Sequence, residues 1–267
     1  MSKIFIEEIK KFEQKLRFGE PFAFVRYSDG EMMMLKGWEL ELGKKIIFGE
    51  KGKETVHNYS YPKEDHKKFD PQEHSWFRDK LMDSFLFEKE GYYKGLISSN
   101  SAGELYDYQF EVLKKNKSEV TSEEHYTFAD LFVNSNYPYF LEHLLPYFFN
   151  YETIMICNES ADIDSLPFKV KKDFRVGYNC MINNYDIIND IKKYIDENNI
   201  QNHLFLFSAS ALSETAIHQL YNHCDKNTYL DIGTCLNHFM NITIDRNYLR
   251  GFWLNSGETD IRLINQW

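Results

Sequence analysis

Cysteine is scarce in this sequence, and the cysteines present are not spaced for chemistry. The 267 residues include four cysteines and nine histidines. The spacing of Cys157, Cys180, Cys224 and Cys235 gives no CxxC pair and suits neither a zinc site nor a disulfide framework. The histidines show no HxH or HxxxH spacing, which argues against a zinc enzyme. We therefore expect buried thiols in a reducing compartment.

Sequence signatures of several large enzyme classes and of membrane proteins are also missing. The chain has no P-loop, no GxGxxG run and no GxSxG nucleophile elbow. No apolar run approaches the roughly 18 residues that a membrane-spanning helix needs. Residues 1–16 interleave charged with apolar positions and lack the apolar core of a signal peptide. We expect a cytoplasmic protein, located at the inner face of the membrane if it contacts a membrane at all.

Positive charge is in deficit as well. The chain has 31 Lys and Arg against 41 Asp and Glu, which gives a formal net charge of −10. We expect no nucleic-acid partner and at most peripheral membrane contact, because both surfaces are bound through clustered basic residues. A small anionic substrate stays compatible with the acid excess, because a metal ion can bridge carboxylates to phosphate groups.

Apolar and aromatic side chains, by contrast, are abundant. Hydrophobic residues make up 43% of the chain and aromatic residues 16%. This composition is typical of a globular protein, and the length suffices for a large α/β domain with a sizeable core. The aromatic residues fit either a core or a surface that stacks on sugars or bases, and we favour the core.

Short apolar runs alternate with segments of helical periodicity along the chain. This alternation predicts an α/β, Rossmann-like fold with a mainly parallel sheet and helices on both faces. The predicted strands are residues 22–25, 94–97, 153–157, 174–177, 203–207 and 228–232. The predicted helices are residues 3–17, 31–42, 76–89, 103–114, 137–149, 184–197 and 213–224.

Two regions fall outside this alternation. Residues 44–75 are rich in Lys, Glu, His and Tyr, and we predict a long lid-like loop whose aromatic side chains could cover a ligand. Residues 240–267 are predicted to form an irregular aromatic tail that packs on a neighbour or on a ligand. Since no internal repeat or low-complexity linker occurs, we expect residues 1–267 to form a single domain.

The run Arg26-Tyr27-Ser28-Asp29-Gly30-Glu31 directly follows the first predicted strand. Parallel sheets bind ligands at the carboxyl ends of their strands, and a glycine permits a tight turn there. Asp29 and Glu31 flank that glycine, so both carboxylates could converge on one hard cation such as Mn²⁺ or Mg²⁺. Arg26 offers donors suited to a phosphate or uracil oxygen. The alternative is an ordinary Asp-Gly turn in which Glu31 favours the start of the next helix.

Two further polar turns follow predicted strands. Asn100 comes after the strand 94–97 and could hold a ribose or sugar hydroxyl. Ser208 and Ser210 precede a predicted helix, whose N-terminal N–H groups form a natural anion site. Helix capping is the alternative for both turns.

Several segments together resemble one known family. Residues 24–31, FVRYSDGE, resemble the opening motif of the GT-D-fold glycosyltransferases, formerly a domain of unknown function (DUF1792). Residues 204–213 and 230–233 are similar to two later strand-and-turn segments of that family, and residues 183–188 resemble a segment that precedes them. Two departures leave acceptor choice and phosphate contacts open: Ser208-Ala209-Ser210 replaces the usual Gly-Pro turn, and Thr234 stands where His is common.

The resemblance implies a Rossmann-like glycosyltransferase that uses a DxE motif for Mn²⁺ and takes a UDP-sugar donor. Asp29 and Glu31 occupy the two acidic positions of that motif. Arg26, Tyr27 and Ser28 belong to the same motif, and we assign them to donor binding together with Asn100, Ser208 and Ser210.

We therefore predict a metal-dependent hexosyltransferase that moves a sugar from a nucleotide-sugar to a glycan, lipid-linked or glycoprotein acceptor in bacterial surface polysaccharide or glycoprotein assembly. Such a transfer needs a carboxylate to take the acceptor's proton, and Asp130 is our candidate, with Glu159 and Asp107 as alternatives. A metal-dependent phosphohydrolase and a non-catalytic glycan- or nucleotide-binding module are the competing hypotheses. The sequence identifies neither the sugar nor the acceptor, the stereochemical outcome or the oligomeric state.

Overall fold

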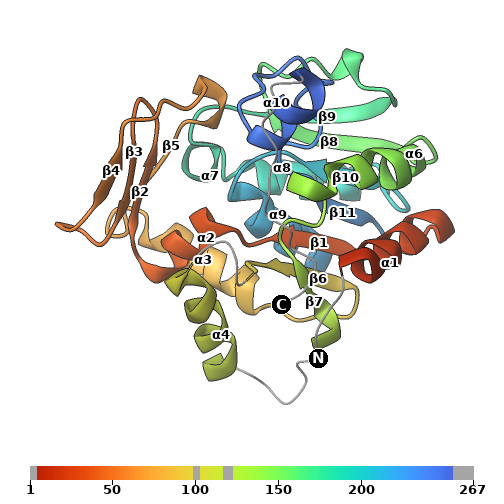
Figure 1. Ribbon diagram of the computed structural model, residues 1–267. Coiled ribbons are helices and arrows are strands. Elements are labelled where there is room, and N and C mark those ends of the chain that lie inside the picture. The colour runs from red at the N-terminus through yellow and green to blue at the C-terminus, as the bar shows by residue number, and fades with distance from the viewer. Residues whose placement is uncertain (1–4, 99–102, 117–122, 255–267) are drawn as a thin grey trace.

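The structure, a computed structural model, describes residues 5–98, 103–116 and 123–254. These residues form two sheets, a large parallel one and a small antiparallel one (Figure 1). The large sheet has the strand order β7-β6-β1-β11-β10-β8-β9, and all of its pairings are parallel. Its strands are β1 (Ala23–Arg26), β6 (Tyr92–Leu96), β7 (Tyr126–Phe128), β8 (Thr153–Asn158), β9 (Val170–Val176), β10 (Leu204–Phe207) and β11 (Thr228–Asp231).

Helices cover both faces of the large sheet because its central strands are apolar on both sides. Val25 and Phe205 point into one buried cluster, whereas Phe24 and Leu206 point into the other. The first cluster is closed by α2 (Asp29–Lys36), α3 (Ser75–Leu86), α4 (Glu104–Asn116), α7 (Cys180–Asn183), α8 (Ile187–Glu197) and α9 (Leu212–His223). The second is closed by α1 (Phe5–Phe18), α5 (Tyr137–Tyr139), a π-helical turn (Phe140–Leu144), α6 (Leu145–Phe148) and α10 (Asn247–Leu254). The predicted α/β, Rossmann-like fold is therefore confirmed.

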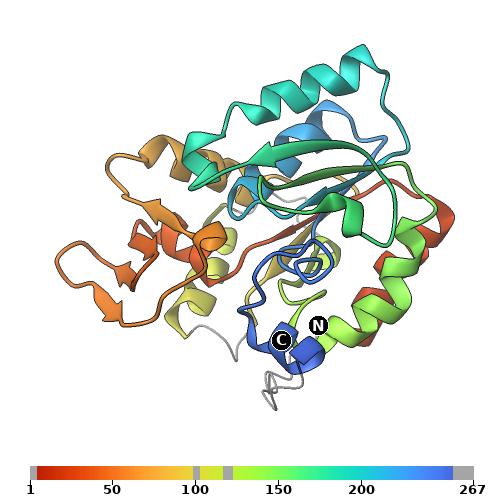
Figure 2. The same ribbon diagram turned by 90° about the horizontal axis from the view of Figure 1, so that it is seen from above.

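The small sheet corrects the prediction for residues 44–75, which are not one long loop. Four short strands pair antiparallel in the order β4-β3-β2-β5, and both views place them at the flank of the main body (Figure 1 and Figure 2). They are β2 (Glu39–Leu42), β3 (Ile46–Gly49), β4 (Thr55–His57) and β5 (Lys67–Phe69).

The predicted helix over 31–42 is wrong in its second half for a local reason. Gly37 adopts φ 80° and ends α2 in a left-handed cap, with its N–H bonded to the carbonyls of the last turn. The following Glu39-Leu40-Glu41-Leu42 alternates apolar with charged residues, which is the period of a half-solvated strand. The other predicted helices and strands each overlap an element of the structure.

The tail predicted to be irregular contains a helix in its described part. Tyr248 and Leu249 of α10 are buried in the second cluster, and the ring of Trp253 stacks on His238 at 3.9 Å. The aromatic residues of this segment thus serve its packing. Among the described residues, no helix has the length and apolar character that crossing a membrane requires.

Candidate functional site

A cavity of about 740 Å³ opens at the carboxyl ends of the large sheet. Its floor is formed by the turns that follow β1, β7, β10 and β11, where parallel sheets generally bind ligands. One wall is the small sheet, and the other is the segment that leads into α10. The volume lies in the range of small-molecule sites, so a nucleotide-sized ligand can be accommodated.

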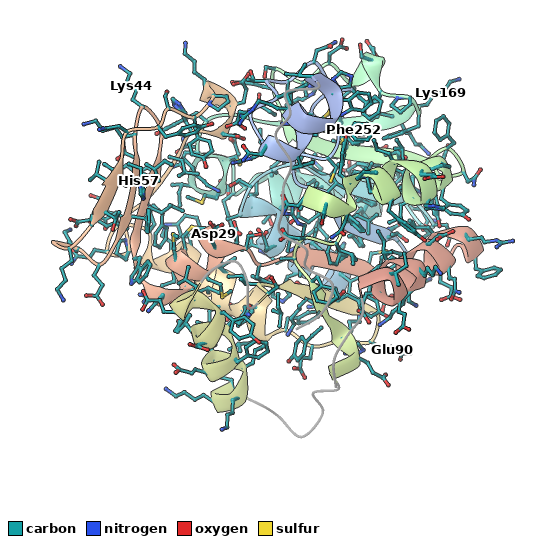
Figure 3. The ribbon with its side chains drawn as sticks, in the orientation of Figure 1. Asp29, Lys44, His57, Glu90, Lys169 and Phe252 are labelled. Carbon is teal, nitrogen blue, oxygen red and sulfur yellow. The ribbon has the colours of Figure 1, made fainter. Side chains whose placement is uncertain are left out.

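Asp29 and Glu31 both border this cavity from the start of α2. Figure 3 shows Asp29 between the main body and the small sheet, which carries His57. The Asp29 side chain is exposed, and its Oδ1 accepts the Gly30 N–H at 2.9 Å. Glu31 is only 7% exposed, and its Oε2 accepts the Ser28 N–H at 3.0 Å. Glu31 thus caps the helix, as the alternative interpretation of this turn expected.

The helical geometry of α2 argues against the predicted convergence of the Asp29 and Glu31 carboxylates on one cation. Residues two positions apart on a helix do not face each other, so the side chains of Asp29 and Glu31 leave α2 in different directions. Within the described ranges, no group of three or more His, Cys, Asp or Glu side chains is arranged to hold a metal ion. Asp29, with Glu31 beside it, therefore offers an incomplete donor set rather than a protein cage.

Arg26 is a cation held beneath the cavity floor. Its Nε donates to the carbonyl of Ala129 at 2.7 Å, and its guanidinium lies so close to Gly233 that a Cβ there would clash with it. Burial alone would lower the pKa of Arg26, but the negative charges of Asp231 and Asp130 among its neighbours outweigh this effect and raise it. Arg26 borders the cavity with part of its donor fork already engaged.

Tyr27 does not border the cavity, which corrects its assignment to donor binding. It is fully buried, and its hydroxyl lies 2.5 Å from Ser84 Oγ in the core beneath α3 and α9. The reason is the alternation of side chains along an extended chain, which sends Val25 and Tyr27 to the same core. Ser28, by contrast, borders the cavity.

Two acids that sequence reasoning did not select lie buried behind Glu31. Asp231, at the end of β11, is 4% exposed and accepts the Gly233 N–H at 3.0 Å. Glu214, in the first turn of α9, is 2% exposed, and no described residue forms a hydrogen bond with its Oε2. Ser213, Glu214 and Thr215 are consecutive polar residues, so nothing in the sequence pattern marked Glu214 as buried.

Burial disfavours the ionised forms of Asp231 and Glu214. Burial raises the pKa of Asp231 to about 6, and the attraction of Arg26 only partly offsets it. Burial, with the nearby charges of Glu31 and Asp231, raises the pKa of Glu214 well above its ordinary value. The acids behind the floor therefore resist ionising, which reduces the negative charge that they place near the cavity.

Ser208 and Ser210 border the cavity where β10 passes into α9. The Ser208 N–H donates to the carbonyl of Ile156 at 2.8 Å, and Ser210 adopts φ 50°, in the left-handed region. Ser210 Oγ accepts a hydrogen bond of 2.8 Å from the Nζ of Lys67 on the small sheet. The structure thus brings these serines together with Asp29 and with Lys67, which no sequence motif pointed to.

Comparison with known proteins rests on fold. No family model and no curated protein sequence matches this chain. One similar structure is a domain of unknown function 1792 described as having a distinct glycosyltransferase fold, with 13% identity, a TM-score of 0.50, and 90% of this chain and 83% of the other covered. Another is a glycosyltransferase (DUF1792) from Streptococcus sanguinis, with 13% identity, a TM-score of 0.52, and 95% and 92% covered.

The chain has the DUF1792 glycosyltransferase fold. The fold implied by the resemblance of the short motifs is thereby confirmed. Since a likeness at 13% identity concerns the fold, the chemistry of the site has to be argued from the residues around the cavity.

The three carboxylates considered as general bases differ in whether they border the cavity of this DUF1792 fold. Asp130 follows β7 and borders the cavity. Glu159 and Asp107 are exposed residues outside the cavity lining. Asp245, which sequence reasoning missed, lies on the opposite wall, and burial raises its pKa although Arg246 opposes the shift. Asp130 and Asp245 are the candidates that the geometry retains.

The remaining predicted positions either border the cavity or lie outside the described ranges. Thr234 borders the cavity, and its Oγ1 lies 2.7 Å from the hydroxyl of Tyr248. Tyr59 and Tyr61 also border it, with ring centroids 5.2 Å apart. Asn100 lies outside the described residues, so its role stays a prediction.

Proposed function

We propose that this protein is a metal-dependent glycosyltransferase that moves a sugar from a nucleotide-sugar, of the UDP-sugar class, to a glycan, lipid-linked or glycoprotein acceptor. The observation that carries the proposal is the cavity at the carboxyl ends of the large sheet, where the Asp29 turn, the Ser208–Ser210 turn and the small sheet meet. The DUF1792 fold supports it, because the similar structures are described as glycosyltransferases. We further propose that the transferred sugar is a hexose. The reaction would belong to bacterial surface polysaccharide or glycoprotein assembly and take place in the cytoplasm.

The carboxylates at the start of α2 fit a Mn²⁺ or Mg²⁺ ion that the protein ligates only in part. Such ions are often held by one or two carboxylates, with substrate phosphates and water supplying the other ligands. The exposed carboxylate of Asp29 suits that arrangement, with Glu31 beside it at the cavity edge. When bound, the metal would supply Lewis-acid stabilisation to the departing diphosphate. The ion should therefore bind together with the nucleotide and only weakly without it.

The groups around the cavity match what the transfer demands. The bond between the sugar carbon and the donor phosphate oxygen breaks, and its electron pair leaves with the nucleoside diphosphate. A new bond joins that carbon to the acceptor oxygen, whose proton passes to a carboxylate. Asp130 is our candidate for this carboxylate because it borders the cavity, whereas Glu159 and Asp107 do not.

Isothermal calorimetry with UDP, in the presence and absence of Mn²⁺, tests the proposal. We expect UDP binding that strengthens with Mn²⁺ in the wild type and not in the Asp29→Ala variant. A thermal-shift screen of UDP-, GDP-, CMP- and dTDP-sugars would then identify the donor, because a ligand of the native state raises its stability. Absence of binding by every nucleotide would overturn the proposal, and release of inorganic phosphate without sugar transfer would favour a phosphohydrolase.

A further inference from the structure

The small sheet presents two chemically different faces. Its register pairs Leu42 with Lys67 and Leu40 with Phe69, so these four side chains share one face. Leu40, Leu42 and Lys67 border the cavity, which makes this the inner face. The neighbouring Lys68 pairs with Glu41 and projects to the other side. The inner face is thus largely apolar, with Lys67 at the strand nearest the main sheet.

The ammonium group of Lys67 spans the gap between the two sheets. It donates to Ser210 Oγ at 2.8 Å, at the turn that precedes α9. On its other side it lies 3.9 Å from the position that a Cβ on Gly30 would take, at the start of α2. Lys67 therefore stands between the two turns that a donor diphosphate would contact.

Lys67 also differs in its partners from three other lysines of the small sheet and its connections. Lys51 lies 3.8 Å from Glu39, Lys53 lies 3.2 Å from Glu50, and Lys68 lies 4.0 Å from Glu41. Across the described ranges, no carboxylate oxygen lies within 4.0 Å of the Lys67 Nζ. The half-buried cation of Lys67 thus keeps its charge available at the cavity.

The position of this cation favours an anion beside it. An ammonium group at the N-terminus of a helix is unfavourable by itself, because the free N–H groups there carry partial positive charge. α9 has twelve residues and begins two residues after Ser210. The first turn of α9 contains Glu214, but its side chain is buried outside the cavity lining. An anion between Lys67 and this turn would satisfy the ammonium, the Ser210 hydroxyl and the helix N-terminus together.

We propose that Lys67 binds the diphosphate of the nucleotide-sugar donor and stabilises the negative charge on the departing nucleoside diphosphate. This inference rests on the proposed function and deepens it, since it assigns the phosphate-binding cation to the small sheet. Lys67 thus acts both in donor binding and in the transfer step. The uridine or other nucleoside is bound elsewhere in the cavity. A purely structural alternative is that Lys67 only balances the buried acids behind the floor.

Calorimetric titration of UDP, uridine and inorganic pyrophosphate at fixed Mn²⁺ distinguishes these roles. We expect Lys67→Met to weaken UDP and pyrophosphate roughly tenfold or more, the loss of one charge-assisted hydrogen bond, and to leave uridine unchanged. Lys67→Arg should retain part of the affinity. Lys68→Met is the matched control, because it removes the adjacent lysine from the outer face of the same strand, and it should bind as the wild type does.

The outcomes separate the inference from the proposed function. If the wild type binds UDP and Lys67→Met binds it within about twofold of wild type, the role of Lys67 is overturned while the proposed function stands. If the wild type binds none of the nucleotides, the proposed function fails. A change in thermal stability of Lys67→Met with an unaltered ratio of UDP to uridine affinity would assign Lys67 to the structural alternative. Should Lys67→Met not fold, Lys67→Gln, with an uncharged amide, takes its place in the same titrations.

Discussion

The two sheets differ in how they are buried. In the large sheet, every residue of β10 and β11 is buried, and so are the first five residues of β8. In the small sheet, β4 is exposed throughout and β2 buries only Leu40. A parallel sheet covered on both faces needs continuous apolar strands, whereas an antiparallel sheet can leave one face in water. The stability of the protein is therefore concentrated in the large sheet.

The sheets also differ in the charges they bring to the cavity. The edge of the large sheet holds the buried acids Glu31, Glu214 and Asp231 together with Arg26. The small sheet adds Lys67 on an inner face that is largely apolar and that also carries His57. The well-packed sheet therefore holds the groups that are costly to bury, and the solvent-facing sheet completes the site from outside.

Paired glycine substitutions provide the strongest test of this contrast. Gly233 and Gly52 both have positive φ, 51° and 85°, but only at Gly233 would a Cβ clash, with Arg26, while Gly52 has open space. We expect Gly233→Ala to lower the free energy of unfolding by about 3 kcal/mol, from backbone strain plus overpacking. Gly52→Ala should cost about 1 kcal/mol from backbone strain alone. Denaturant unfolding measures both, and equal losses would contradict the contrast.

Asp29→Ala tests whether the edge of the large sheet binds the metal through a residue that contributes little to stability. The side chain is exposed, so we expect the free energy of unfolding to change by no more than about 0.5 kcal/mol. Affinity for Mn²⁺ in the presence of UDP should fall roughly 10- to 100-fold, because the metal loses its accessible protein ligand.

Glu41→Ala is the control for Asp29→Ala, since Glu41 lies on the outer face of the small sheet, away from the cavity lining. It should leave Mn²⁺ and UDP affinity unchanged. Equal loss of Mn²⁺ affinity in both variants would place the metal elsewhere or attribute the effect to overall charge.

The same contrast explains how far the sequence alone could predict the fold. Within the predicted strands, residues 22–25, 154–157 and 204–207 are continuously apolar, because both faces of these strands are buried. β4 and β5 have three residues each, with Lys, Thr and His among them, so their strand character arises from cross-strand pairing and not from composition. The large sheet was predictable for this reason, and the small sheet was not.

The candidate site follows the same division. Asp29, Ser208 and Ser210 were predictable because they directly follow apolar strands, and strand ends share one edge of a parallel sheet. Lys67 lies 143 residues from Ser210 in the chain, so only the folded structure reveals their contact. Tyr27 was assigned to the site incorrectly because the alternation that buries it continues past the end of β1.

A pH titration of stability would show the cost of the buried acids. The pKa of Asp231 is raised from 3.8 to about 6 in the folded protein, and that of Glu214 is raised well above 4.5, both first by burial. The folded state then binds more protons than the unfolded state, so stability falls as pH rises from about 4 toward 6, and Glu214 extends the fall further.

Glu214→Gln should flatten this profile, because the amide cannot ionise and resembles the protonated acid. Relative to the wild type, the variant gains stability as pH rises above 4.5, by up to about 1.4 kcal/mol per pH unit for one proton. Glu41→Gln, on the solvent-facing side of the small sheet, should leave the slope unchanged. Denaturant unfolding between pH 4 and pH 8 measures the slope, and parallel profiles for wild type and Glu214→Gln would refute the buried-acid account.

The smallest expected effect concerns how the small sheet is held against the segment that leads into α10. Arg246 Nη2 lies 3.2 Å from Asp65 Oδ2, and its guanidinium lies 5.1 Å from the ring centroid of Tyr61. Thr243 Oγ1 donates to Glu64 Oε1 at 3.1 Å beside this pair. These contacts join the two walls of the cavity. They link η1 (Lys63–Asp65) to the segment just before α10.

Arg246→Met should therefore act locally. Partly exposed ion pairs and cation–π contacts contribute little, so the free energy of unfolding should fall by about 1 kcal/mol or less. Amide hydrogen exchange should nevertheless quicken in β4 and β5, since the small sheet loses an anchor and opens locally, while β10 and β11 stay protected. Lys68→Met, which removes only the outward pair with Glu41, should leave exchange unchanged. Uniform acceleration across both sheets would show that they unfold as one unit, and the division between a stable floor and a separately anchored wall would no longer hold.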